Sequence, residues 1–434
     1  MNKDFVKSLT LKELFKEKLV IPEYQRPYVW TKTEIEKLLF QFSEHINREG
    51  EKPNFYLGSI VLHKNGDEYN IIDGQQRITT MQILQLIKNK QTFGITYDHP
   101  LTQQHIKDNY SFFKDKEFKL IDFESINVTT VITESEDMAY NFFETLNTGG
   151  KRLGGTDILK AHHLRSVTDN EDRNSFAFQW EKKQKNLEDV NRMLSKIRRM
   201  DYLKGGNFVP DKFTDDNKWK NFLTEDFAEK AKKESRDIGY SFVEIEENTH
   251  KITADKYAIR QPLNEGANYI NYLLSFTEDY NFLFTIDENK SDKYSKFNRE
   301  IINHIDGTVD LRSFYQLSLM CFVDRFGRKN VLEFSLYLFR FIYSLRLSEQ
   351  SRIYEATVRN FVTANLLLDR ILNAFTYEEI LSYLKNYEFK TSNKENSGVK
   401  QRFLERVSKF FESNISIENF SSDLARQIEN YLKK

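Results

Sequence analysis

The chain of 434 residues is long enough for two to four domains at roughly 100–200 residues each, so it can bury a substantial core. Hydrophobic residues make up 39% and charged residues 30%, with 36 Phe and 22 Tyr, which excludes a disordered or low-complexity chain. The 64 Lys and Arg balance 65 Asp and Glu, so the formal charge of −1 gives no whole-molecule attraction to nucleic acid or to anionic membranes. Any nucleic-acid contact must come from a local patch of charge.

The cysteine content and the start of the chain indicate the compartment. The single Cys321 lies in an apolar run, which predicts a buried thiol that packs as a small hydrophobe rather than a reactive nucleophile. One cysteine permits no internal disulfide, and the first residues lack the apolar segment of a signal peptide. No run of ~18 apolar residues occurs either. We therefore predict a soluble cytoplasmic protein that does not contact a membrane.

Helix and strand signals alternate over the first part of the chain. Thr10 and Glu13 have the capping-box spacing at the start of a helix, and Thr31 or Thr33 can cap the next one. The expected elements are, in chain order, a helix at 8–18, a helix after Trp30, strands at 55–63 and 68–72 joined by an Asn-Gly turn, a helix from Ile78, a strand at 126–133, and helices at 136–146 and 158–167. This order predicts an α/β domain at residues 1–165.

The sequence predicts that the remainder of the chain is helical. Strand signals become scarce after about residue 170, and long amphipathic segments replace them. All six prolines fall at or before Pro262, so few helix breakers follow. Loops are expected around 205–206, 248–253 and 306–307. We predict an α-helical domain at 166–390 and a C-terminal helical segment at 391–434 that packs on it, so that the whole chain is of the α+β class.

Of the motifs in the sequence, an Asp-Gly-Gln-Gln-Arg turn between a predicted strand and a predicted helix has the clearest chemical interpretation. Gly74 lets the chain turn without a Cβ, so the amides of the helix N-terminus point at one spot, where an anion is favoured. Arg77 can reach the same spot with a planar fork suited to phosphate. Gln75 or Gln76 can bind a sugar or base edge or orient a water molecule, and Asp73 can hold Mg²⁺ or a sugar hydroxyl. The turn is a candidate nucleotide-phosphate site.

Two other polar blocks lie at the ends of predicted elements. The first is a stiff loop between two prolines at residues 21–30. Its candidate site residues are Tyr24, Gln25 and Arg26. The aromatic side chains of this loop can stack a base or anchor the loop, and both readings stay open. The second block, Phe-Phe-Glu-Thr-Leu-Asn at 142–147, is followed by Asp157 and Lys160.

In motif and in order, the three blocks resemble the signature of the GmrSD-type restriction endonuclease N-terminal family. The resemblance covers about residues 10–165 and implies a ParB/sulfiredoxin-like nucleotide-binding fold. It also implies that a nucleoside triphosphate is bound or hydrolysed at the Asp-Gly-Gln-Gln-Arg motif, in DNA restriction directed against phage. In ParB-like folds a Gly-x-x-Arg turn cradles the triphosphate, and Gly74 and Arg77 have that spacing.

The resemblance implies site residues position by position. The implied catalytic residues are Asp73, Gln75, Gln76 and Arg77. The implied nucleotide-binding residues are Tyr24, Gln25, Arg26, Gly74, Arg77, Thr79 and Asn147. Asp73 is also the implied ligand of Mg²⁺.

The C-terminal region departs from the family pattern. Complete members often carry an HNH nuclease domain, which needs a histidine general base and metal ligands. The last histidine here is His304, and neither His nor Pro follows it. The adjacent His162 and His163 point about 100° apart on a helix, so we do not expect them to share a metal ion. We expect this chain to lack its own HNH nuclease and a separate nuclease subunit to cut DNA.

Two segments of the helical region can be interpreted either as functional or as structural. Arg192, Lys196 and Arg199, in a basic stretch, can share one helical face for phosphate contact or form an ordinary solvated face. The aromatic run at 334–343 has helical spacing and is expected to be core.

These features predict a component of a GmrSD-like restriction system that binds or hydrolyses a nucleoside triphosphate and whose nucleotide state controls cleavage of DNA, modified DNA included. Two alternatives stay open. One is a non-hydrolysing, nucleotide-switched DNA-binding module, and the other is a nuclease or nickase that uses the ParB-like site itself. A homo-oligomer is also left open.

Overall fold

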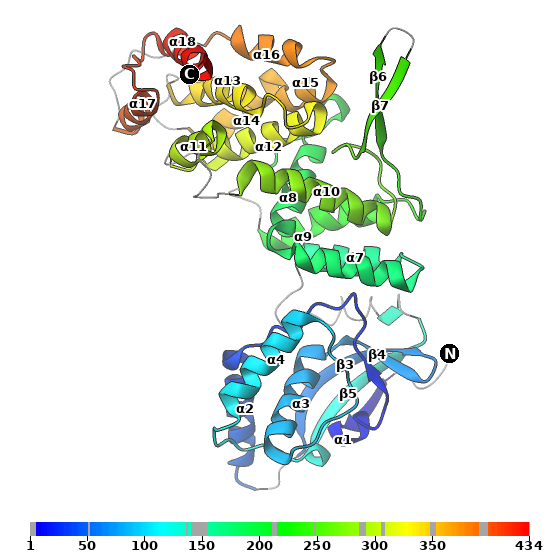
Figure 1. Ribbon diagram of the computed structural model, residues 1–434. Helices are drawn as coiled ribbons and strands as arrows, with labels where there is room; N and C mark the ends of the chain where they lie inside the picture. The colour runs from blue at the N-terminus through cyan, green and yellow to red at the C-terminus, as the bar shows by residue number, and fades with distance from the viewer. Residues whose placement is uncertain are drawn as a thin grey trace. The chain divides into compact units, whose positions relative to one another are not determined.

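The chain forms two compact units, Met1–Leu153 and Gly154–Lys434 (Figure 1). The computed structural model describes residues 6–50, 53–135, 138–139, 154–210, 215–246, 249–285, 292–304, 309–347, 353–389 and 398–433. The domain boundaries expected at 165 and 390 stay predictions, and residues 390–397, beside the second of these boundaries, lie outside the described residues.

The first unit is built on a mixed five-stranded sheet. Its strands are β1 (Val6–Thr10), β2 (Leu19–Val20), β3 (Phe55–Asn65), β4 (Glu68–Asp73) and β5 (Ile126–Thr133). The order across the sheet is β1-β5-β3-β4-β2. The central β3 runs antiparallel to β4 and parallel to β5, while β1 pairs with β5 and β2 with β4. This sheet confirms the α/β class predicted for the N-terminal region.

Local signals predicted most of this sheet. The β3–β4 hairpin turns at the expected Asn-Gly pair, where Gly66 has a φ of +63° that suits a residue without Cβ. Strand β5 has the bounds predicted from its β-branched run. Strand β1 was not predicted, because its sequence lacks alternation and its formation depends on distant pairing, with Val6 opposite Val131.

The helices of the first unit share one apolar core with the sheet (Figure 1). They are α1 (Leu11–Leu14), α2 (Lys32–Ile46), α3 (Gln75–Asn89), α4 (Pro100–Phe113) and the 3₁₀ turn η1 (Phe123–Ser125). Ile35 and Phe42 of α2 and Ile78 of α3 are fully buried in this core, as is Ile60 of β3. The spacing of the buried residues on α2 is that of one helical face, so its polar face remains outside, whereas α3 is buried on nearly all sides over its first three turns.

The capping box expected at Thr10 and Glu13 is present, and Thr31, one of the two cap candidates for the next helix, caps α2. Glu13 Oε2 accepts a hydrogen bond from the Thr10 amide at 2.8 Å, and Thr10 Oγ1 accepts one from the Glu13 amide at 3.2 Å. Thr31 and Glu34 form the same arrangement at the start of α2. The helix predicted at 8–18 is observed only over Leu11–Leu14, because the residues before it pair in β1.

The second unit is α-rich. Its helices are α6 (Gly155–Arg165), α7 (Asn170–Lys182), α8 (Gln184–Arg199), α9 (Asp216–Thr224), α10 (Ala267–Phe284), α11 (Lys293–Phe297), α12 (Val309–Phe326), α13 (Val331–Tyr343), α14 (Glu355–Asn365), α15 (Leu367–Asn373), α16 (Tyr377–Lys385), α17 (Gly398–Phe410) and α18 (Phe420–Lys433). Short 3₁₀ and π-helical turns join them at η2 (Tyr202–Lys204), η3 (Glu225–Glu229), η4 (Asn298–Ile302) and η5 (Ser344–Leu347).

Helices α12 and α13 supply much of the apolar core of this unit. Phe334, Phe339 and Phe341 are fully buried, which confirms that the aromatic run at 334–343 is core. Cys321 is fully buried in α12, and burial raises the pKa of its thiol, so it packs as the predicted small hydrophobe. Within the described ranges, no helix combines the length and the apolarity needed to cross a bilayer.

A hairpin in the second unit was not predicted. Strands β6 (Tyr240–Glu246) and β7 (Thr249–Lys256) pair antiparallel inside the region expected to be all helix, where a loop was expected at 248–253. Charged residues interrupt the apolar ones along both strands, which weakens the period-two signal. Residues 166–390 are therefore α-rich rather than all-α.

Candidate functional site

The Asp-Gly-Gln-Gln-Arg motif forms the turn from β4 into α3. Asp73 ends the strand, Gly74 is the residue before the helix, and α3 begins at Gln75. Gly74 has a φ of +101°, and a Cβ there would lie 2.9 Å from Ile60 Cγ1, so both the backbone and the packing require glycine. No side chain caps the N-terminus of α3, and its first turn holds no acidic residue. The first amides of α3 therefore keep the positive end of the helix dipole uncompensated by a capping side chain.

Arg77 lies in the first turn of α3 and turns back onto β3. Its Nη1 donates to the Leu57 carbonyl at 3.3 Å, and its Nη2 donates to the Ser59 carbonyl at 2.7 Å and to Asp73 Oδ2 at 3.2 Å. These contacts use three of the five N–H groups of the guanidinium. About a quarter of each side chain of the Arg77–Asp73 pair is exposed. Arg77 thus supports β3, and two of its N–H groups have no partner among these contacts and are candidates to bind an anion.

The two glutamines of the motif have different roles. Gln76 Oε1 accepts hydrogen bonds from the Val29 and Trp30 amides at 2.9 and 3.2 Å, and its Nε2 donates to the Pro27 carbonyl at 3.1 Å. These contacts hold the 21–30 loop, so Gln76 is a structural clamp and not the water-orienting residue that the sequence suggested. Gln75 is also buried, and its Oε1 has no hydrogen-bond partner in the described structure.

The loop predicted to face the motif does pack against it. Gln25 Nε2 donates to the Ile72 carbonyl at 2.8 Å, one residue before Asp73. Tyr28 is fully buried, with its hydroxyl 2.8 Å from Thr80 Oγ1, and burial raises its pKa to about 12. The aromatic residues of this loop were expected either to stack a base or to anchor the loop, and Tyr28 anchors it. The loop is thus attached to Ile72 of β4 and to Gln76 and Thr80 of α3.

The remaining predicted site residues divide into three groups. Tyr24 is buried and Arg26 is half-buried in the same loop. Thr79 is fully buried in α3, which leaves it no open surface for a ligand in this conformation. Asn147 and its block at 142–147 lie outside the described residues.

The third block continues into α6 with two polar residues. The Gly154 amide donates to Asp157 Oδ2 at 3.3 Å, so Asp157 closes the start of the helix. Lys160 is paired with Glu181, and both side chains are buried. These two residues have structural partners within the second unit.

A polar cluster on β3 and β5 beside Arg77 was missed by sequence reasoning. The Tyr56 hydroxyl lies 3.2 Å from both Ser59 Oγ and Thr129 Oγ1. The hydrogen bonds that Tyr56 shares with Ser59 and Thr129, and then the charge of Arg77, lower the pKa of Tyr56. The available signal was Gly58 inside a predicted strand, since a Cβ there would lie 2.1 Å from Arg77 Nη1.

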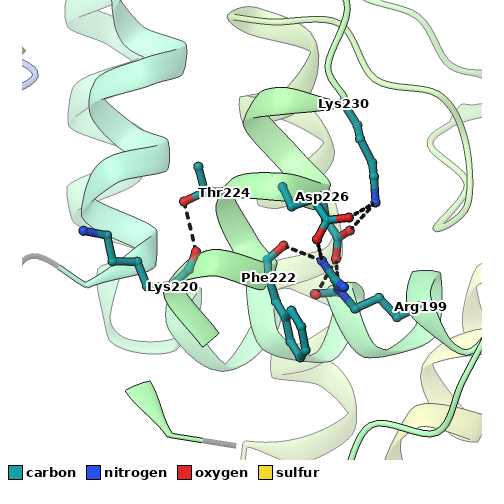
Figure 2. A network of polar contacts seen from close by, with 8 residues as sticks. Arg199, Lys220, Phe222, Thr224, Asp226 and Lys230 are labelled. Carbon is teal, nitrogen blue, oxygen red and sulfur yellow. Dashed lines mark hydrogen bonds and ion pairs between the residues drawn. The ribbon is translucent and has the colours of Figure 1, made fainter. Parts of the chain in front are cut away.

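The basic face expected on α8 is tied up in internal contacts. Arg192 pairs through Nη2 with Asp216 of α9 at 3.0 Å and through Nε with Glu188 of its own helix at 2.9 Å. Lys196 is buried, with its Nζ 3.2 Å from Ser313 Oγ of α12. Arg199 Nε pairs with Asp226 at 2.6 Å (Figure 2). These residues form neither the free phosphate-binding face nor the ordinary solvated face that the sequence suggested, because they crosslink neighbouring helices.

The adjacent histidines do not form a metal site. His163 is fully buried, with Nδ1 accepting from the Gly266 amide at 3.2 Å and Nε2 3.0 Å from the Phe227 carbonyl. Burial lowers its pKa well below the usual value, so it is a neutral core histidine. Over the described residues, no group of three or more His, Cys, Asp or Glu side chains could hold a metal ion.

Comparison with known proteins identifies the first unit and the family of the chain. Residues 11–164 match the GmrSD restriction endonuclease, N-terminal domain, which confirms the resemblance of the three blocks and defines the class of this α/β domain. Residues 172–400, more than half of the chain, match a family of unknown function (DUF7834), and the chain belongs to that family. No curated protein matches the chain. The ParB/sulfiredoxin-like relationship of the first unit stays a prediction.

Proposed function

We propose that this protein is the nucleoside-triphosphate-binding component of a GmrSD-like DNA restriction system. The observation that carries the proposal is the turn from β4 into α3, where an uncapped helix N-terminus, a guanidinium and a carboxylate lie together. The first unit matches a restriction endonuclease N-terminal domain, which supports DNA as the eventual target. In this account the nucleotide controls cleavage that another subunit performs.

The phosphates bind at the start of α3. The amides of the first turn and the two remaining donors of Arg77 stabilise the negative charge, because an α-helix N-terminus and a planar guanidinium both favour phosphate. Gln75 Oε1, buried without a partner, accepts a hydrogen bond from a sugar hydroxyl, a base amino group or a water. The first of these roles uses amides that no side chain caps, and the second requires the buried Gln75 Oε1 to become exposed when the ligand binds.

Asp73 is the residue that would hold Mg²⁺. Asp73 offers a single carboxylate that is one-quarter exposed. This fits nucleotide sites, in which one or two carboxylates, several waters and the phosphates complete the octahedral coordination of Mg²⁺. The bound ion would neutralise phosphate charge. Asp73 would then exchange its contact with Arg77 for the ion, which frees a further guanidinium donor.

Hydrolysis in this account depends on Gln75. A glutamine amide can orient an attacking water, and Gln76 is excluded from that role because both ends of its amide hold the 21–30 loop. Phosphate release measured with and without DNA tests turnover. Negligible release together with intact binding would assign the second candidate, a non-hydrolysing nucleotide switch.

Titration calorimetry with ATP and GTP in the presence of Mg²⁺ tests the binding site. We expect Arg77→Lys to weaken binding by roughly ten- to hundredfold, about 1.5–3 kcal/mol, because lysine keeps the charge and loses the fork. Arg48→Lys, an exposed site at the end of α2, is the matched control and should bind as the wild type does. Equal affinity of the Arg77→Lys variant and the wild type would reject the site.

A plasmid-nicking assay addresses cleavage by the chain itself. Supercoiled plasmid is incubated with Mg²⁺ and either the wild type or Asp73→Asn. In the proposed function neither protein nicks the plasmid, since a separate subunit performs cleavage. Nicking by the wild type that Asp73→Asn abolishes would make this chain the nuclease.

A further inference from the structure

A basic pocket lies at the C-terminal end of the second unit. Its volume is about 350 Å³, and it is formed where α17 packs beside η5 and the end of η4. The charged and titratable residues that line it are His304, Arg346, Arg402, Arg406, Lys409 and Glu405. Four strongly basic side chains therefore face one carboxylate across the pocket, in a chain whose overall charge is close to zero.

Three of these cations share one face of α17. Arg402, Arg406 and Lys409 are four and three residues apart, the spacing that places side chains on one side of a helix. All three are exposed, whereas Phe403 and Val407 of the same helix are buried in the unit. The row spans about 10 Å along the helix axis at ~1.5 Å per residue.

The positive charge of this face is not cancelled locally. Within the described part of the chain, no carboxylate lies within ion-pair distance of Arg402, Arg406 or Lys409. The basic residues of α8 differ, since Arg192 and Arg199 each pair with an acidic side chain. The α17 face is thus available to an external anion in a way that the α8 face is not.

A buried guanidinium also lines the pocket. Arg346 belongs to η5 and is only 7% exposed. The pocket combines this buried side chain with a rim of exposed, solvated cations, which suits a ligand that stays at the surface.

We propose that this pocket and the α17 face bind the sugar-phosphate backbone of duplex DNA. Three cations spread over about 10 Å exceed the reach of one phosphate group, whereas the phosphates of one DNA strand recur every ~3.4 Å along the duplex axis. The contact is independent of base sequence because only phosphates are read. The choice of DNA among polyanions rests on the proposed function; the anion site itself rests on the pocket.

Fluorescence anisotropy of the full chain with a labelled 24-base-pair duplex of arbitrary sequence tests the proposal. The test variant is the triple R402Q/R406Q/K409Q, which changes only exposed residues and leaves Arg346 in place. The matched control is K232Q/K233Q/K329Q, which removes the same charge from exposed lysines elsewhere in the second unit. Circular dichroism verifies that both variants remain folded.

We expect the test triple to weaken DNA binding at least tenfold and to lower the slope of log affinity against log salt by about two to three, while the control stays within twofold of the wild type. Equal binding by the test triple and the control, or no DNA binding by the wild type, would overturn the proposal. ATP and inorganic phosphate are added as competitors, to test whether the anion that binds this pocket is a free phosphate compound and not DNA. Loss of ATP binding in the test triple with unchanged DNA binding would also overturn it, whereas loss of nucleotide binding only in Arg77→Lys concerns the first unit alone.

Discussion

Arg77 has two roles that the sequence could not separate. The motif suggested a phosphate ligand, and the structure adds three contacts that attach the first turn of α3 to β3 and to Asp73. This close approach is possible because Gly58 has no side chain. The positions of the guanidinium and of the strand therefore depend on each other.

Gly58→Ala should weaken the candidate nucleotide site indirectly, by displacing Arg77. The new Cβ would lie 2.1 Å from Arg77 Nη1, and the φ of +119° at this position disfavours any L-residue. We expect a loss of unfolding free energy of about 1–3 kcal/mol and weaker nucleotide binding, measured by urea denaturation and calorimetry. Gly66→Ala is the control, since it also has a positive φ but nothing lies within 4 Å of its Cβ, so it should lose stability and keep affinity. Wild-type affinity in Gly58→Ala would show that Arg77 is not positioned by this contact.

Asp324 gives the second unit a pH-dependent stability. Burial raises the pKa of this carboxyl from 3.8 to about 7, and the Ile259 amide donates to its Oδ2 at 3.3 Å. The folded protein therefore keeps a proton that the unfolded chain releases near pH 4. The stabilising effect is complete below that pH and is lost as the pH rises from about 4 to 7.

Asp324→Asn should remove this dependence. Between pH 5 and pH 8, we expect the unfolding free energy of the second unit to fall by about 2–4 kcal/mol more in the wild type than in the variant. Urea denaturation at the two pH values measures the difference. Asp189→Asn, which changes an exposed carboxylate of the same unit, should follow the wild type. Parallel pH profiles for wild type and Asp324→Asn would contradict the assignment.

At the scale of elements, the contact between α3 and the 21–30 loop explains the arrangement of two separate motifs. Gln76 satisfies three backbone groups of the loop, while Gln25 and Tyr28 return contacts to β4 and α3. The two motifs thus form one folded structure. Part of their shared signature reflects this packing and not direct contact with a ligand.

Gln76→Ala should release the loop. The Val29 and Trp30 amides and the Pro27 carbonyl lose their partner, which we expect to cost about 2 kcal/mol of stability and to speed hydrogen exchange at both amides. Gln76→Glu is an informative comparison, because it keeps the acceptor for both amides but places a second acceptor oxygen against the Pro27 carbonyl. It should keep slow exchange at the Val29 and Trp30 amides and still lose stability. Unchanged exchange at these amides in Gln76→Ala would argue against the clamp.

The elements that could be predicted are those whose signals are local. The Thr10–Glu13 capping box and the cap at Thr31 need only a short local pattern, and the β3–β4 turn needs only an Asn-Gly pair. Strand β1 and the β6–β7 hairpin were missed because cross-strand pairing, and not their own periodicity, defines them.

At the scale of the whole molecule, the candidate site could be located from the sequence but not described in detail. The Asp-Gly-Gln-Gln-Arg spacing predicted the strand-to-helix turn correctly, since glycine and helix periodicity are local signals. The partners of Gln76, and the crosslinks of Arg192 to Asp216 and of Arg199 to Asp226, involve residues at least 24 positions away in the sequence. The α17 face was missed for the same reason, because folding brings η5 and α17 together.

The two proposed sites lie in different units, which makes a single measurement decisive for the central claim. Hydrogen exchange of the full chain, followed by mass spectrometry with and without saturating ATP and Mg²⁺, reports each unit separately. We expect ATP to slow exchange in peptides that cover Asp73 to Thr80, with no change in α12 and α13, and the effect to disappear in Arg77→Lys. Protection that is absent from the start of α3 at a saturating ATP concentration would contradict a nucleotide site at this turn.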